Sequence, residues 1–466
     1  MQKIFAIAGL TWKAAFRFRL FLVLAGLLLA AVVGLPLVIK DDGTARGFTQ
    51  ILLTYTLSAI TGLLGFSTLW LACGTLARDI EECQIQVLVT KPVARWQIWL
   101  GKWLGILSLN AVLLALAGMC VFGLLQWRAT KLPPGEQKNL REQILVARGS
   151  AKPQNPAAQI VVAAENELRT RLADHPELAR SPELPEVKQQ LIEQFKAPFQ
   201  LVPPGYSRVW QIDLGAEKDS LHGKPLQLRI KFNASASQPG MGGTLTGLWQ
   251  VGDPEKMHVW QSEPMSLSPD TFHEFQIPAD LLDDKGMLTI AFRNVNDNTV
   301  MLFPIGDGIE VLYPRGGFAM NFARGMAIIF CWMALLAALG LAAASFLSFP
   351  VAAFFSLAML VLVLSSGTLA EAVGTGSVAA GNEEPGESGH SPADIVLIPA
   401  FKAILSVVNL VKDFSPVDSL STGRVITWSE LGLAFAQIVL LPGGIISLIG
   451  IALFSRRELA TAQGTQ

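Results

Sequence analysis

Long runs of apolar residues without a charge are concentrated toward the two ends of the chain and are missing from its middle. They cover residues 20–39, 47–77, 103–127, 325–370 and 431–455. The run at 325–370 is long enough for two helices, and Ser348-Phe349-Pro350 marks a turn inside it. Because about 20 apolar residues span the hydrocarbon core of a bilayer, the pattern predicts six transmembrane helices.

The charges that flank these runs predict the orientation of the helices. Basic residues precede the first run, lie between the second and third, and follow the last: Lys3, Lys13, Arg17, Arg19, Arg78, Lys91, Arg95, Lys102, Arg456 and Arg457. Six crossings put all of these on one side, and the side richer in Lys and Arg is the cytoplasm. We therefore expect a multi-pass protein of a bacterial inner (plasma) membrane, in contact with lipid, with both termini cytoplasmic.

Residues 19–127 are expected to hold the first three transmembrane helices and residues 321–455 the last three. Two further helices are expected that do not cross the membrane. Residues 1–18 predict a cytoplasmic amphipathic helix on the membrane surface, with one face formed by Ile4, Ile7, Ala8, Thr11, Trp12 and Ala15. Residues 394–412 are apolar but are interrupted by Pro399 and Lys402, so an outer re-entrant or interfacial helix is expected there. Residues 456–466 are left as a cytoplasmic tail.

The middle of the chain has the composition of a folded soluble domain. Residues 128–320 are expected to form an extracytoplasmic α+β domain inserted between the third and fourth helices. Residues 128–203 are rich in Glu, Gln, Lys, Leu and Ala, and they predict helices. Residues 204–316 alternate apolar and polar positions, as at Leu226, Leu228 and Ile230, and predict a jelly-roll-like β-sandwich.

Trp210, Trp249 and Trp260 are the candidate ligand contacts of this predicted sandwich, because an indole ring stacks well against a sugar. The alternative is that these tryptophans fill the core. Asp297 and Asp307 are in the same way either calcium ligands or turn residues, since Asp favours turns for its backbone hydrogen bonds.

Composition narrows the classes of function. Of the 466 residues, 51% are hydrophobic and only 16% are charged, whereas about a quarter of a soluble chain is charged. The net charge of −1 lacks the basic excess that binds nucleic acid, so no nucleic-acid partner is expected. Cys73, Cys83, Cys120 and Cys331 all lie outside the predicted sandwich, so neither a disulfide framework nor a cysteine-based zinc site is available there.

The loop between the second and third apolar runs is too apolar to be freely solvated. Asp79 and Glu82 have the spacing of a capping box, which predicts a short helix over 79–90 that Lys91-Pro92 ends. A second segment, residues 95–103, then leads into the third span. The apolar residues Ile80, Ile85 and Leu88 need a partner to cover them.

This loop resembles that of the ABC-2 type permeases. Its acidic short helix is followed by Val87-Leu88, by Pro92-Val93-Ala94-Arg95 and by Gly101-Lys102, and the chain ends its last span with Arg456-Arg457-Glu458-Leu459, which is similar to the tail of that family. The resemblance covers residues 1–127 and 320–466. It implies the permease subunit of an ATP-binding-cassette exporter, a homodimer or heterodimer of permeases, and a separate cytosolic ATPase that binds ATP and Mg. The residues it implies for contact with that ATPase are Asp79, Ile80, Glu81, Glu82, Ile85, Leu88, Pro92 and Arg95.

The sequence lacks a motif for ATP binding, which agrees with an ATPase on a separate chain. No GxxxxGK[ST] phosphate-binding loop occurs in the sequence, so catalysis by this chain alone is not expected, and neither is a cofactor of its own. At the centre of the predicted spans only Asn110, Gln437 and scattered Ser and Thr are polar, which disfavours a membrane-embedded enzyme. The remaining alternative is a membrane sensor or scaffold whose sandwich binds a cell-envelope ligand.

Overall fold

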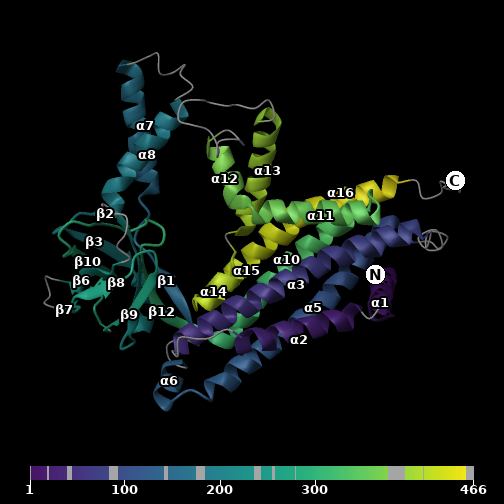
Figure 1. Cartoon of the computed structure of the whole chain (residues 1–466), viewed down its shortest axis with the longest axis horizontal. Helices are drawn as coiled ribbons and strands as arrows, with labels where there is room; N and C mark the ends of the chain where they lie inside the picture. The colour runs from purple at the N-terminus through teal and green to yellow at the C-terminus, as the bar shows by residue number, and fades with distance from the viewer. Residues whose placement is uncertain are drawn as a thin grey trace. The chain divides into compact units, whose positions relative to one another are not determined.

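The computed structural model describes residues 2–17, 20–38, 45–82, 93–140, 145–174, 184–235, 243–253, 258–278, 280–375, 394–412 and 414–457. The chain divides into two compact units. One is a helical unit, formed by Met1–Val146 and Gly317–Gln466, and the other is a β-rich unit, Ala147–Gly316. Each is described by itself (Figure 1).

The helical unit contains the long apolar segments. Its helices are α1 (Gln2–Arg17), α2 (Leu20–Val38), α3 (Ala45–Glu81), α5 (Arg95–Ala129), α6 (Pro134–Asn139), α10 (Phe318–Ala344), α11 (Phe349–Leu364), α12 (Ser366–Thr375), α13 (Asp394–Lys412), α14 (Pro416–Ser421), α15 (Trp428–Ala434), a π-helix (Phe435–Gly443) and α16 (Gly444–Arg456). Helices α3, α5 and α10 pack on one another at the centre, and α2, α11 and α16 pack around them.

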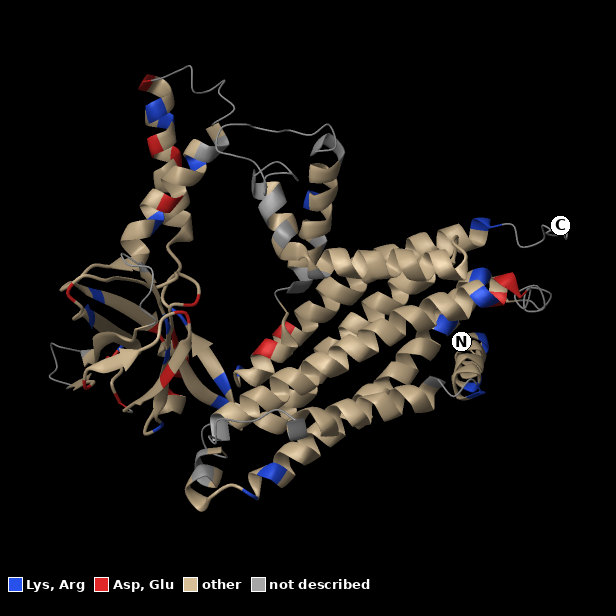
Figure 2. Cartoon of the chain, viewed as in Figure 1, with Lys and Arg blue, Asp and Glu red and all other residues tan. Residues whose placement is uncertain are grey.

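Several of these helices have the length and composition of membrane spans. In the described part of the chain, Gly47–Glu81, Arg95–Ala129, Phe318–Ala344 and Trp428–Arg456 qualify, and a fifth is counted if α1 and α2, bent by 69°, form one broken span. Their ribbons carry charges mainly near the ends (Figure 2). The prediction of a polytopic helical membrane protein is therefore confirmed in its general form.

The predicted number of six spans is not reached by length alone. Helix α11 has 16 residues, about 24 Å, which is shorter than the hydrocarbon core of about 30 Å. Its start agrees with the sequence, because the chain turns at Ser348 and Phe349 opens the helix. Helix α13 forms where an interrupted apolar helix was expected.

The N-terminal helix α1 forms where an amphipathic helix was expected. Ile7, Ala8, Thr11 and Ala15 are buried, as the amphipathic pattern predicts, and this face of α1 packs on α5 of the same unit. The side chains of Phe5 and Leu10, on other faces of α1, are more than half exposed. The apolar stripe of α1 is thus a protein–protein contact within the chain.

The β-rich unit contains three sheets and a few helices. Its helices are α7 (Ala157–Asp174), α8 (Leu184–Gln200) and α9 (Lys218–Leu221). One sheet has the order β1 (Val146–Ala151), β12 (Ile309–Gly317), β4 (Leu226–Lys231), β9 (Phe272–Ile277). The second has the order β3 (Ser207–Asp213), β10 (Met287–Asn294), β6 (Leu245–Asp253), β7 (His258–Gln261), with β8 (Met265–Leu267) also on β6. The third consists of β2 (Leu201–Val202), β11 (Val300–Leu302) and β5 (Asn233–Ser235).

The core of the β-rich unit comes from the alternating positions seen in the sequence. Leu228 and Ile230 of β4, Ile290 of β10 and Val311 of β12 are fully buried, and Trp249 is 1% exposed. Gln227 and Arg229, on the other face of β4, are buried as well, because Arg148, Glu274 and Glu310 form ion pairs and hydrogen bonds with them. Both faces of this sheet are therefore covered.

One predicted element of this region was wrong. The sequence predicted a helix over much of residues 136–149, but α6 ends at Asn139 and β1 follows from Val146. β1 lies beside β12 at the edge of the four-stranded sheet. Its partner strand is more than 150 residues away in sequence, so local composition gave no signal for it.

Candidate functional site at the helix ends

The candidate site is built from the end of α3, the start of α5 and the end of α16, where the loop motif and the C-terminal motif meet. The sequence placed Asp79 at the start of a new helix. The structure instead continues α3 to Glu81, so Asp79 lies in its last turn and is not an N-cap there. The capping-box prediction was wrong because the apolar face of α3 continues to be buried: Leu76 and Ala77 are at most 1% exposed.

Asp79 is paired with Lys102, which lies on α5. The Lys102 ammonium contacts the Asp79 carboxylate and donates a second hydrogen bond to the carbonyl of Thr75, at 2.7 Å. The side chain of Lys102 is 8% exposed and that of Asp79 is 25% exposed. This pair joins α3 to α5. A buried ammonium needs a carboxylate and hydrogen-bond acceptors around it, and here both come from α3.

Glu81 joins α3 to α11. Its Oε1 accepts a hydrogen bond from the backbone N–H of Phe349 at 2.9 Å, in the first turn of α11. The first amides of a helix have no partner within the helix, and its positive end favours a carboxylate. Arg78 lies 4.5 Å from the centre of the Phe349 ring, which adds a cation–π contact between the same two helices.

Arg95 joins the start of α5 to the end of the last span. Its Nη1 donates to the carbonyls of Phe454, Ser455 and Arg457, at 3.2, 2.7 and 2.8 Å. The last carbonyls of a helix have no partner within the helix and carry partial negative charge, which a guanidinium neutralises. Arg457 in turn donates to the carbonyl of Ser345, just past α10, at 3.2 Å.

These contacts form one group, which we call the helix-end cluster. It is defined by Asp79, Glu81, Arg95, Lys102 and Arg457. It connects α3, α5, α11 and α16 to one another and reaches the end of α10. Within the cluster Lys102 is buried, and Asp79, Arg95 and Arg457 are half-buried.

Helix α1 covers the start of α5 through two glycines. A Cβ on Gly101 would lie 2.7 Å from Ile7 Cβ, and one on Gly105 would lie 2.7 Å from Thr11 Cβ. Small residues four apart allow two helices to approach closely. The Trp12 indole donates to Ser108 Oγ at 2.6 Å, one turn further along α5.

The predicted ATPase contacts have different outcomes. Asp79, Glu81 and Arg95 lie in the helix-end cluster. Ile80 is partly buried against the apolar core of the same end of the helices. Glu82 follows α3 as an exposed turn residue. Ile85, Leu88 and Pro92 lie outside the described residues, together with most of the predicted helix over 79–90.

Sequence reasoning missed the acceptors and donors that these side chains use. Thr75, Ser345 and Phe349 contribute only backbone groups, so their side chains gave no signal. The available signal was positional: charged residues at the two ends of apolar runs are placed to satisfy helix termini.

The three predicted ligand contacts of the β-rich unit are not equivalent. Trp249 is buried in the core, with its ring centroid 4.6 Å from that of Phe292, so its assignment as a ligand contact was wrong. Trp260 is partly buried and stacks on Phe275 at 6.1 Å. Trp210 is partly buried too, but it lines a cleft.

Metal binding finds no support in the described residues. No three His, Cys, Asp or Glu side chains come together there as a possible metal site. Asp307, one of the two candidate calcium ligands, has its carboxylate 3.2 Å from the Lys152 ammonium.

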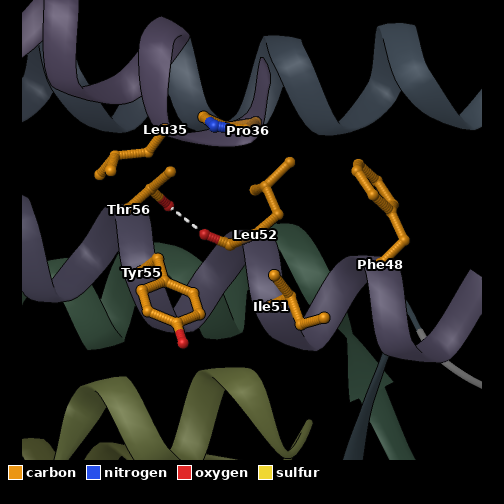
Figure 3. Close-up of a pocket in the computed structure, with 7 residues that line it drawn as sticks. All are labelled: Leu35, Pro36, Phe48, Ile51, Leu52, Tyr55 and Thr56. Atoms are coloured by element: carbon orange, nitrogen blue, oxygen red, sulfur yellow. Dashed lines mark hydrogen bonds between the residues drawn. The ribbon is translucent and has the colours of Figure 1, made fainter. Parts of the chain in front are cut away.

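Small cavities lie between helices of the helical unit. A cavity of about 10 Å³ lies between α2 and α3, which is space for about one water molecule. Leu35 and Pro36 of α2 face Leu52 and Thr56 of α3 across it, and the Thr56 hydroxyl is directed to the Leu52 carbonyl at 2.5 Å (Figure 3). Deeper in the bundle, the Asn110 amide donates to the Thr68 hydroxyl at 2.8 Å.

Comparison with known proteins adds no relative to this description. No protein-family model, no curated protein sequence and no solved structure matches the chain.

Proposed function

We propose that this protein is the permease subunit of an ATP-driven exporter, with six membrane spans and a separate cytosolic ATPase that acts on the helix-end cluster. The observation that carries the proposal is the hydrogen bonding of Arg95 to the end of α16. It unites the two segments whose sequences resemble ABC-2 permeases and that lie more than 350 residues apart. A partner that moves the loop after α3 would thereby act on the last span directly.

The proposed topology follows from the course of α5 and α10. α5 begins in the helix-end cluster and ends at Ala129, ahead of the β-rich unit in the chain, while α10 begins directly after that unit and ends near Ser345. Trp96 and Trp127, both about half exposed, lie near the two ends of α5. They are about 46 Å apart along the helix, close to the thickness of a bilayer with its headgroups, and Trp is enriched at both interfaces. We infer that the helix-end cluster is cytoplasmic and that residues 147–316 are outside.

Cysteine labelling tests this topology. In a variant whose native cysteines are replaced, a membrane-impermeant maleimide added to intact cells should modify Gln250→Cys and should not modify Trp96→Cys. Both positions are exposed in the folded chain, so accessibility differs only through the membrane. After permeabilisation both should react, which shows that each thiol is available. Labelling of Trp96→Cys alone in intact cells would reverse the proposed orientation.

Photo-crosslinking tests the partner. A benzophenone amino acid at position 96 should capture an ATP-binding chain in cells, whereas the same residue at position 127 should not. The two tryptophans are similarly exposed and lie on one helix, so position 127 is a matched control. Mass spectrometry should find a phosphate-binding loop in the captured chain. If no ATPase is captured at position 96, the transport proposal fails and a sensor or scaffold becomes the better reading.

A further inference from the structure

The strand β3 has an open edge. It is the first strand of the five-stranded sheet, and within the described residues its only strand neighbour is β10. It has seven residues, and the third of them, Val209, is 57% exposed. Proteins commonly protect such an edge with Pro, Lys or a bulge, because its free N–H and C=O groups can pair with another strand. None of the residues of β3 is Pro or Lys.

The register shows which backbone groups face outward. Asn294 donates to the carbonyl of Tyr206, and Leu214 donates to the carbonyl of Gly286, so even-numbered positions bond to β10. Hydrogen-bonded pairs alternate along an antiparallel ladder. The N–H and C=O groups of Val209, Gln211 and Asp213 therefore point away from β10, toward the open edge.

A cleft of about 590 Å³ runs along this edge. Its lining includes Arg208, Val209, Trp210 and Gln211 in succession, which is typical of a cleft beside a strand because one face of a strand shows only alternate residues. Most of the rest of its lining comes from Pro153–Pro156 and Phe303–Ile305, and from Gln159 of α7 and Phe199 of α8. Its size is within the range of ligand-binding clefts.

Arg208 gives the cleft a positive group, whose guanidinium carbon lies 5.5 Å from the centre of the Trp210 ring. Its Nη1 donates to the carbonyl of Pro198 at 2.9 Å, but its Nε is buried without a hydrogen-bond partner. No carboxylate pairs with it in the described part of the chain. Burial lowers the pKa of the Arg208 guanidinium below its ordinary value, which reports the cost of removing it from water. A carboxylate in the cleft would restore that interaction.

We propose that this cleft binds an extended, acidic peptide segment, which adds as a strand to the open edge of β3 and places a carboxylate beside Arg208. The backbone of Val209, Gln211 and Asp213 supplies donors and acceptors for such a strand. A glycan chain fits less well, because the Trp210 ring already packs against Phe303 at 5.3 Å and Trp249 at 6.4 Å. This site belongs to the β-rich unit alone and does not depend on the transport proposal.

The test uses the full-length protein in detergent and a labelled seven-residue peptide of alternating threonine and valine with one central glutamate. Fluorescence anisotropy should detect saturable binding. The same peptide with every amide methylated should bind at least about tenfold more weakly, because its donors to the strand are gone. The peptide with glutamine in place of glutamate should also bind about tenfold more weakly.

Two variants locate the site. Val209→Pro removes one outward N–H and should weaken binding by about tenfold or more, since edge positions tolerate proline. Val259→Pro is the matched control: Ser262 donates to the carbonyl of Trp249, so Val259 also faces outward, on the edge strand β7 of the same sheet. Arg208→Gln should weaken the glutamate peptide to the level of the glutamine peptide and leave the latter unchanged.

The outcomes are decisive in both directions. Loss of binding in Val209→Pro but not in Val259→Pro, with both retaining the thermal transition of the unchanged protein, supports strand addition. The proposal is overturned if the peptide does not bind at millimolar concentration or if methylation of its amides has no effect. It is equally overturned if a linear tetrasaccharide of N-acetylglucosamine displaces the peptide and binds Val209→Pro normally.

Discussion

Asp79→Ala is expected to lower the free energy of unfolding by about 3 kcal/mol, at the lower end of the range for breaking a buried ion pair. The substitution leaves the Lys102 ammonium 8% exposed, with the Thr75 carbonyl as its remaining partner at the end of α3. A buried charge without its counter-ion costs more than the lost attraction. The lower end applies because the Asp79 carboxylate is 25% exposed and already partly hydrated. Reversible unfolding in mixed detergent micelles measures the change.

Substitution of the other member of the ion pair, Lys102, provides the control. Lys102→Met fills the space with an apolar chain and leaves Asp79 able to hydrate, so we expect a loss of only about 1 kcal/mol. The double variant should cost about 2 kcal/mol less than the sum of the two single ones, since the two groups interact directly. If the two single variants lost equal amounts of unfolding free energy and the double variant lost their sum, the idea that the buried Lys102 ammonium depends on the Asp79 carboxylate would be contradicted.

Gly101→Leu is expected to destabilise the chain by about 1 to 3 kcal/mol or more, through displacement of α1. Even a Cβ at this position would lie 2.7 Å from Ile7 Cβ and 3.0 Å from the backbone carbonyl oxygen of Ile4. A backbone atom cannot move aside as a flexible side chain can. Gly123→Leu is the matched control on the same helix, because nothing lies within 4 Å of a Cβ there, and it should cost nothing or stabilise α5 slightly.

Removal of α1 separates steric displacement from damage to α5 itself. In a chain without residues 2–17, Gly101→Leu should lose its effect, because the side chain would enter space that Ile7 no longer occupies. The unfolding free energies of the four proteins, with and without α1 and with and without the substitution, give the coupling. A cost that persists without α1 would assign the role of Gly101 to the rest of the bundle.

Prediction from sequence succeeded where one local property decides the structure. Charge-free apolar runs became helices because backbone groups in an apolar environment must be satisfied within the segment. The strand β4 was visible because Leu228 and Ile230 belong to a period-two pattern that has only one buried arrangement. Contacts between distant segments have no such local signal.

The candidate site shows the same division. All five members of the helix-end cluster stand in the short motifs that the sequence analysis quoted, and Asp79, Glu81 and Arg95 were predicted there as contacts of an ATPase. The contacts that they make within the chain were not predicted. The helix assigned to begin at Asp79 failed because the burial of Leu76 and Ala77 extends α3 further than the capping pattern indicated. Tertiary packing overrode a local capping signal.

The sequence by itself determined that this chain has long apolar helices at both ends and a polar, strand-rich middle, because hydropathy and periodicity are properties of contiguous residues. Only the tertiary structure decided that Arg95 completes the end of α16 and that α1 packs on Gly101 and Gly105. It alone also decided that, among the described strands, β3 has a neighbour on one side only. Those features depend on contacts between backbone groups and small residues that lie far apart in the sequence. Such contacts are set by the packing of the whole chain.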